Sequence, residues 1–177
     1  MLSGFYTTAF LFHEFGHRQV AIHYGLQTKF RLLTFGMIIT GMGLIMGIIS
    51  LVSTNLTLPT IAIPGAVVVL GLDKIDRTTG LCKVAGPTIN LIYGIILLII
   101  SLLIPKGLYP LNMFIGIAAA LNFTLGAFNM LPIGILDGKA IFSWNKGVYI
   151  SLFLSLVGLL IFTYINVYDI NISLYFP

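Results

Sequence analysis

A histidine and glutamate pattern near the amino terminus is the strongest chemical signal in this chain. Residues 13–17 read His-Glu-Phe-Gly-His, an HExxH pattern. On a helix, side chains four positions apart project from the same face, so His13 and His17 can bind one metal ion. Glu14 lies about 100° further around the helix and can reach a water molecule on that metal. Two histidines hydrogen-bonded inside a bundle would explain each residue singly, but not their spacing. The pattern therefore predicts two ligands and the general base of a zinc hydrolase.

A third protein ligand is expected, because catalytic zinc usually has three of them plus water. His23 has the spacing of the metzincin pattern HExxHxxGxxH, but that pattern needs a glycine where this chain has Val20. On a continuous helix His23 also faces away from His17. Asp137 is the better candidate, because Pro132 breaks the preceding helix and leaves an irregular backbone that can aim a side chain inward. The alternative for Asp137 is an ordinary turn aspartate before glycine.

The composition places this motif in a membrane protein. Of the 177 residues, 58% are hydrophobic and only 8% are charged, whereas soluble domains carry about 25% charged residues. The net charge of +4 comes from basic residues scattered between apolar segments, which is typical of loops at a lipid surface and does not indicate a nucleic-acid partner. The single cysteine, Cys82, excludes an internal disulfide and a cysteine-based zinc site. We therefore expect residues 1–177 to form one domain in a lipid bilayer.

The apolar segments predict an all-α polytopic membrane protein with about four to six transmembrane helices. Four segments have the length of about 20 residues that a bilayer core requires, at residues 2–24, 84–104, 111–131 and 148–165. A fifth segment, 32–52, contains four glycines and either crosses the membrane once or re-enters it. Residues 60–84 are predicted to form a short membrane-associated β element, with a strand at 60–72 and a turn at 76–80 that leads to a second strand.

The placement of basic residues favours the re-entrant topology for segment 32–52. In that topology eight of the nine lysines and arginines fall on one side of the membrane, and only Lys106 lies opposite. The positive-inside rule makes the basic side cytoplasmic. His17 and Asp137 then lie near the same cytoplasmic face of a multi-pass cell-membrane protein. If the segment crosses once, the basic residues divide between the two sides and Asp137 lies at the face opposite the histidines.

Three motifs in a fixed order resemble the site-2 protease family of intramembrane metalloproteases. They are His-Glu-Phe-Gly-His at 13–17, Gly-Pro-Thr-Ile-Asn at 86–90 and the segment 129–138, which matches NxxPxxxxDG. That family shows HExxH, a GPxxN helix start and NxxPxxxxDG in this order. There are departures: only twelve residues precede HExxH, whereas many members have an earlier helix, and segment 32–52 lengthens the gap to GPxxN.

The resemblance implies a site and an activity. It implies that His13, His17 and Asp137 hold one zinc ion and that Glu14 is the catalytic glutamate. Its implied substrates are transmembrane proteins, cleaved in or near their membrane segments, often to release a membrane-tethered regulator. It further implies that the amides of Asn90 and Asn129 line or brace the site. For the mechanism, Asn129 either donates a hydrogen bond to the oxyanion or, as Asn90 also could, only fixes loop geometry.

Two alternatives to a protease use some of the same residues. The first is a non-proteolytic metal-binding membrane protein with the same ligands, in which Glu14 has no role. The second is a transporter subunit in which His13, Glu14 and His17 form a proton or ion relay, because ionisable groups at membrane depth mark such pathways. A relay would not need Asp137 as a ligand.

Overall fold

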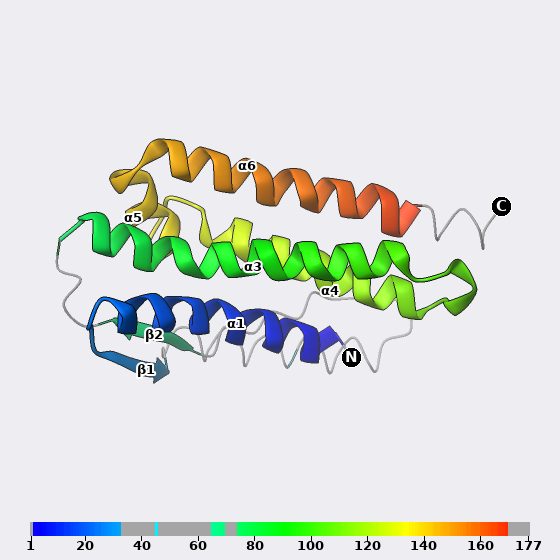
Figure 1. Ribbon diagram of the computed structural model, residues 1–177, viewed down its shortest axis with the longest axis horizontal. Coiled ribbons are helices and arrows are strands. Elements are labelled where there is room, and N and C mark those ends of the chain that lie inside the picture. The colour runs from blue at the N-terminus through cyan, green and yellow to red at the C-terminus, as the bar shows by residue number, and fades with distance from the viewer. Residues whose placement is uncertain (1, 33–44, 46–64, 70–73, 170–177) are drawn as a thin grey trace.

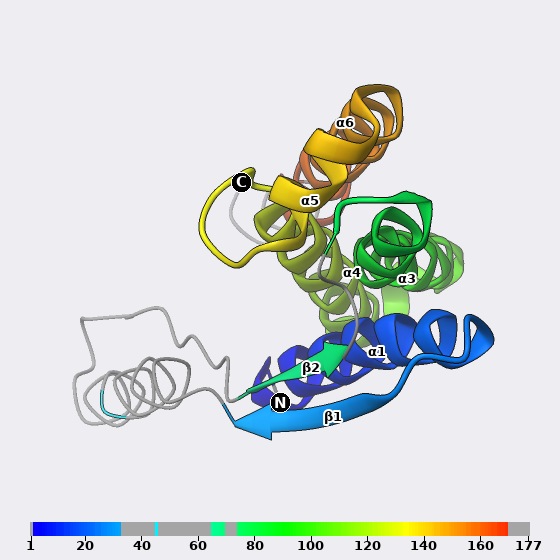
Figure 2. The same cartoon turned by 90° about the vertical axis from the view of Figure 1, so that its left-hand side faces the viewer.

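The computed structural model describes residues 2–32, 45, 65–69 and 74–169 (Figure 1). Five helices account for most of this part of the chain: α1 (Leu2–His23), α3 (Arg77–Leu103), α4 (Leu111–Asn129), α5 (Asp137–Trp144) and α6 (Lys146–Thr163). A 3₁₀ turn, η1 (Lys106–Leu108), follows α3, and a π-helical turn, η2 (Tyr164–Asp169), extends α6. The end-on view shows α4 at the centre of the bundle, where it contacts α1, α3 and α6 (Figure 2).

Three of these helices are long and apolar enough to cross a membrane, namely those at 77–103, 111–129 and 146–166. They confirm the helices predicted at 84–104, 111–131 and 148–165 as elements of that length and composition. Helix α1 forms over the predicted segment 2–24, but it is not one of the three, because the polar residues of the HExxH motif and Arg18 lower its hydropathy. Of the predicted segment 32–52, the structure describes only Leu32 and Ile45. The rest of the segment lies outside the described residues.

The predicted β hairpin within residues 60–84 is wrong. One strand, β2 (Gly65–Val69), does form inside that range, but its partner is β1 (Thr28–Leu32), which directly follows α1. The two strands are antiparallel, with Thr28 opposite Val69 and Leu32 opposite Gly65. The described chain is therefore all-α apart from this two-stranded ribbon, which lies beside α1 (Figure 2).

The second predicted strand is absent because the chain from Arg77 onward belongs to α3. The side chain of Asp76 caps this helix by accepting a hydrogen bond from the Thr79 N–H at 2.8 Å. Backbone hydrogen bonds, first of all the one from Thr79, hold the pKa of Asp76 below its usual value. The run at 76–80 is thus a helix start and not a turn. The helix begins seven residues before position 84 and continues through Pro87.

A buried apolar cluster joins the helices on the side away from α1. Its largest members are Leu98 of α3, Phe123 of α4, Met130 just after α4, Ile141 of α5 and Leu156 of α6. Large aliphatic side chains elsewhere on these helices point outward and are exposed, as expected where the surrounding solvent is lipid. Helix α5 packs against α3 and α6, and its first residue is Asp137.

Candidate metal centre

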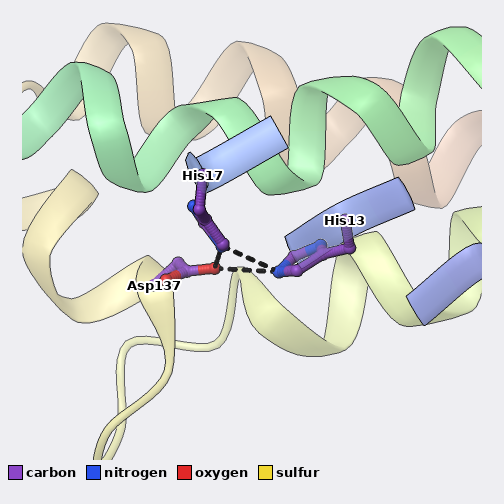
Figure 3. A group of neighbouring side chains, drawn as sticks. All are labelled: His13, His17 and Asp137. Carbon is purple, nitrogen blue, oxygen red and sulfur yellow. Dashed lines mark hydrogen bonds and ion pairs between the residues drawn. The ribbon is translucent and has the colours of Figure 1, made fainter. Parts of the chain in front are cut away.

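His13, His17 and Asp137 are buried and converge on one point (Figure 3). The Nε2 atoms of the two histidines lie 3.0 Å apart. Oδ2 of Asp137 lies 3.0 Å from Nε2 of His17 and 3.2 Å from Nε2 of His13. Helix α1 supplies both histidines from one face, and α5 supplies the aspartate across the bundle. Residues 124 positions apart in the sequence therefore form one three-atom cluster.

Two glycines allow α1 and α3 to approach each other closely beside this cluster. A Cβ atom at Gly16 would lie 2.9 Å from the carbonyl oxygen of Ala85. A Cβ atom at Gly86 would lie 2.5 Å from Nε2 of His17 and 2.6 Å from Nε2 of His13. Small residues serve this purpose between membrane helices, because they let the backbones approach. At Gly86 the missing side chain lets both histidine rings pack directly against α3.

The outer nitrogens of both histidines are held by hydrogen-bond acceptors on α3. Nδ1 of His13 lies 2.5 Å from Oδ1 of Asn90, and Nδ1 of His17 lies 2.7 Å from the carbonyl oxygen of Cys82. Because a carbonyl oxygen only accepts, each Nδ1 carries the hydrogen. A neutral imidazole with Nδ1–H presents the lone pair of Nε2, which is the form that a metal ligand requires. Both Nε2 atoms face the cluster.

Packing at both ends of α5 places Asp137. A Cβ atom at Gly138 would overlap the carbonyl oxygen of Met130, so the start of α5 lies directly against the end of α4. At the other end, the Trp144 ring occupies the space that a Cβ atom at Gly80 would take, so α5 also packs on the first turn of α3. The predicted irregular backbone before Asp137 is present, with Gly134 at φ +58°, but the short helix α5 after it was not predicted.

The donor set and its dimensions fit a zinc ion. Two imidazole nitrogens and one carboxylate oxygen form a known three-ligand set of catalytic zinc, which leaves a fourth position for water. Ligand bonds of 2.0–2.1 Å at tetrahedral angles put neighbouring donor atoms about 3.3 Å apart. The observed separations of 3.0 to 3.2 Å are close to that value. The preset histidine tautomers agree with the same conclusion.

Glu14 and Asn129 lie differently with respect to this cluster. Glu14 is buried and directly follows His13 in α1. Asn129 is the last residue of α4, and its amide nitrogen donates to the carbonyl oxygen of Leu125 one turn earlier at 3.0 Å. Among the described residues, no hydrogen bond joins Asn129 to the histidines or Asp137. Of the two predicted asparagines, the structure thus brings only Asn90 into contact with a proposed ligand.

His23 lies outside the cluster, at the exposed end of α1. Its ring packs edge-on against Tyr24 and lines an apolar cleft of about 410 Å³ between α1 and α3. None of the three clustered residues lines this cleft. The continuous helix therefore turns His23 to a different face, as expected for a chain with valine in place of the metzincin glycine.

Two residues at the site were missed in the sequence. Lys83 donates to Oδ1 of Asp137 at 3.0 Å, and Asn122 accepts from Nδ2 of Asn90 at 3.1 Å. Lys83 shares one face of α3 with Gly86 and Asn90 at spacings of three and four residues, a signal that becomes visible once α3 is known to begin before Lys83. Asn122 is a buried polar residue inside an apolar helix, which is itself a signal for a polar partner.

Comparison with known proteins found one informative relative. The chain is 31% identical, over 156 residues, to a protein of Methanocaldococcus jannaschii that bears the name "Putative zinc metalloprotease MJ0611". The aligned residues make up 88% of this chain and 75% of that protein. No family model matches the chain, and no solved structure matches it.

Proposed function

This chain belongs to the family of the "Putative zinc metalloprotease MJ0611", and from that premise we propose that it is an intramembrane zinc metalloprotease of the site-2 protease type. The observation that carries the proposal is the buried cluster of His13, His17 and Asp137, with Glu14 next to the first ligand. Three helices able to cross a membrane support the assignment to a multi-pass membrane protein. The proposed substrates are transmembrane proteins, cleaved in or near their membrane segments.

In the proposed reaction, His13, His17 and Asp137 hold the zinc ion. When bound, zinc lowers the pKa of a coordinated water to about 7 and polarises the scissile carbonyl group. Glu14 takes a proton from the attacking water as the new C–O bond forms at the carbonyl carbon. It then delivers that proton to the amine nitrogen as the C–N bond breaks. Asn90 and the Cys82 carbonyl keep both imidazole rings oriented throughout.

The helix ends support a site near the cytoplasmic face. Helix α1 ends, and α3 and α6 begin, at the same end of the bundle (Figure 1). That end carries Arg77 and Lys146 as the first residues of α3 and α6, whereas Lys106 follows the far end of α3. By the positive-inside rule the end with more basic residues is cytoplasmic. Lys83 and Asp137 lie near this end, so water could reach the proposed site from the cytoplasm.

The substrate must expose its peptide bond before attack. A transmembrane helix satisfies its own backbone hydrogen bonds and thereby buries the bond to be cut. We therefore expect the substrate segment to be unwound or extended locally at the site. Cleavage should be faster for substrates that carry helix-breaking residues near the scissile bond, because proline and glycine lower the free-energy cost of unwinding.

The test uses purified protein in detergent or vesicles, with zinc content and cleavage of a model transmembrane substrate measured together. Wild type is expected to hold one zinc ion per chain and to cleave. Glu14→Gln should keep the zinc and lose cleavage, because it removes the base and none of the three ligands. His17→Ala and Asp137→Ala should lose both. His23→Ala is the matched control from the same helix and should retain both, since His23 lies outside the cluster.

The outcomes separate the proposed protease from its alternatives. Equal cleavage by wild type and Glu14→Gln would overturn the assignment of the base. Zinc binding without any cleavage would favour the non-proteolytic metal-binding protein. Unchanged metal content in Asp137→Ala would favour the ion or proton relay, which does not need that ligand.

A further inference from the structure

In the described part of the chain, Asp137 pairs with His13, His17 and Lys83. Of these three partners, only Lys83 is not a proposed metal ligand. Its Nζ atom lies 3.0 Å from Oδ1 of Asp137, and its side chain is one-third exposed at 33%. A buried carboxylate needs a charged or hydrogen-bonding partner, and holding the long lysine side chain beside it costs conformational entropy. The position of this ammonium group suggests what it does.

The two oxygens of Asp137 have different partners. Oδ2 faces both histidine Nε2 atoms, at 3.0 and 3.2 Å, whereas Oδ1 faces Lys83. A carboxylate with two free oxygens can bind a metal ion through both of them. When one oxygen accepts a hydrogen bond from an ammonium group, only the other remains for the metal. Oδ1 of Asp137 is therefore taken up by Lys83, and only Oδ2 is left for the ligand cluster.

Residues close to Lys83 in α3 contact the two histidines directly. The carbonyl oxygen of Cys82, the preceding residue, accepts from His17 Nδ1, and Gly86 packs against both histidines. The part of α3 that orients the histidines thus also carries the group that orients Asp137. Trp144 packs on Gly80 independently of Lys83, so α5 has a second attachment to α3.

We propose that Lys83 is a positioning residue that restricts Asp137 to one metal-binding oxygen and so keeps the metal four-coordinate, with three protein ligands and one water. This inference rests on the proposed metalloprotease function. It assigns Lys83 no contact with substrate. A lysine that served only to attach α5 to α3 would affect stability, but it would not alter the coordination number of the metal.

The test replaces zinc with cobalt(II), whose visible absorption is several-fold stronger in four-coordinate sites than in five-coordinate sites. Lys83→Met should still bind one cobalt ion per chain, but with weaker bands, because Asp137 can then use both oxygens. Its cleavage rate with zinc should fall about 10- to 100-fold, the usual effect of removing a group that orients a metal ligand. Lys83→Arg keeps a donor to Oδ1 and should restore the wild-type spectrum. Lys139→Met is the matched control, since Lys139 is exposed on α5 two residues after Asp137.

Two results would overturn the proposal: a spectrum and rate for Lys83→Met equal to wild type, or a spectrum for Lys83→Arg as weak as that of Lys83→Met. If Lys83→Met does not fold, Lys83→Ala removes the same donor and is judged by the same criteria. Failure of the proposed function is distinguishable, because wild type itself would then bind no metal or cleave no substrate. If wild type binds and cleaves while the Lys83 variants are unchanged, only the role of Lys83 is refuted.

Discussion

Oδ1 of Asn90 lies 2.5 Å from Nδ1 of His13, and the amide nitrogen of the same asparagine is bonded on its other side. Nδ2 donates to the carbonyl oxygen of Ala9 and to Oδ1 of Asn122, each at 3.1 Å. Both hydrogens of the amide are used, so the side chain cannot turn over to present its nitrogen to His13. The chain of contacts from Asn122 through Asn90 to His13 therefore joins α4, α3 and α1, and it ends on a proposed ligand.

Removal of the Asn90 amide should weaken metal binding. Asn90→Ala leaves Nδ1 of His13 without its acceptor, so the ring can rotate or change tautomer. We expect zinc affinity to fall about 10- to 100-fold, as is usual when the hydrogen-bond partner of a metal ligand is lost. Competition with a chelator measures the affinity. Thr88→Ala, two residues earlier on the side of α3 that lines the apolar cleft, is the control and should bind as wild type does. An unchanged affinity in Asn90→Ala would show that His13 needs no orienting partner.

Asn122→Ala should lower zinc affinity less than Asn90→Ala does, and its main effect should be on the stability of the fold. In Asn122→Ala one hydrogen of the Asn90 amide loses its acceptor inside the bundle, while the bond to Ala9 remains. A buried donor left unsatisfied costs about 1–3 kcal/mol of folding free energy. Thermal unfolding in detergent should therefore show a lower midpoint for Asn122→Ala than for wild type. Its zinc affinity should lie between those of wild type and Asn90→Ala. A greater loss of affinity in Asn122→Ala than in Asn90→Ala would contradict the proposed order of contacts.

The histidine pair was predictable from sequence because it is local. His13 and His17 lie one helical turn apart, and that spacing alone puts their side chains on one face. Asp137 could be predicted only from the helix break before it and from the resemblance to a known motif order. Its distance from the histidines depends on how α5 packs against α3 and α4. Neither Trp144 nor Gly80 carries a local pattern that indicates this contact.

The contact between Lys83 and Asp137 was not predictable, because the sequence predicts a turn and a strand where α3 begins. The run Asp76-Arg77-Thr78-Thr79-Gly80 has the residue types of a turn, and aspartate and threonine are equally common at helix starts. Only the hydrogen bond from Thr79 to Asp76 decides between these readings. With a strand assumed in this region, Lys83 could not be placed on the same helical face as Asn90. The ribbon partner of β2 was missed for a related reason, since strand pairing is a long-range contact.

The cap at Asp76 should make stability depend on pH in the acid range. The pKa of Asp76 is lower in the folded protein than in the unfolded chain, so the folded state favours the ionised carboxylate. Its contribution is therefore fully present above the unfolded pKa of about 3.9 and is lost as the pH falls through the folded pKa. Asp76→Asn keeps a good cap but does not titrate. Between about pH 5 and pH 3, the thermal midpoint of wild type should fall relative to that of Asp76→Asn. Parallel curves for the two proteins would show that the cap does not contribute through its charge.

A methyl group at Gly86 should remove metal binding more effectively than any change outside the three ligands. The added Cβ would lie 2.5 Å from Nε2 of His17 and 2.6 Å from Nε2 of His13, too close to both donor nitrogens for them to stay in place. Helix α3 would have to move away from α1, or the histidines would have to rotate out of the cluster. Zinc content of purified Gly86→Ala should therefore fall well below one ion per chain, with cleavage lost in parallel.

Gly158→Ala is the control for this last substitution, because a Cβ atom at Gly158 of α6 meets nothing within 4 Å. It also makes a glycine-to-alanine change inside a membrane-length helix, so any general effect of that change on helix propensity is shared. Gly158→Ala should keep full zinc content and wild-type cleavage. Full zinc content in Gly86→Ala would mean that both histidines can keep their ligand positions although α3 carries an added methyl group.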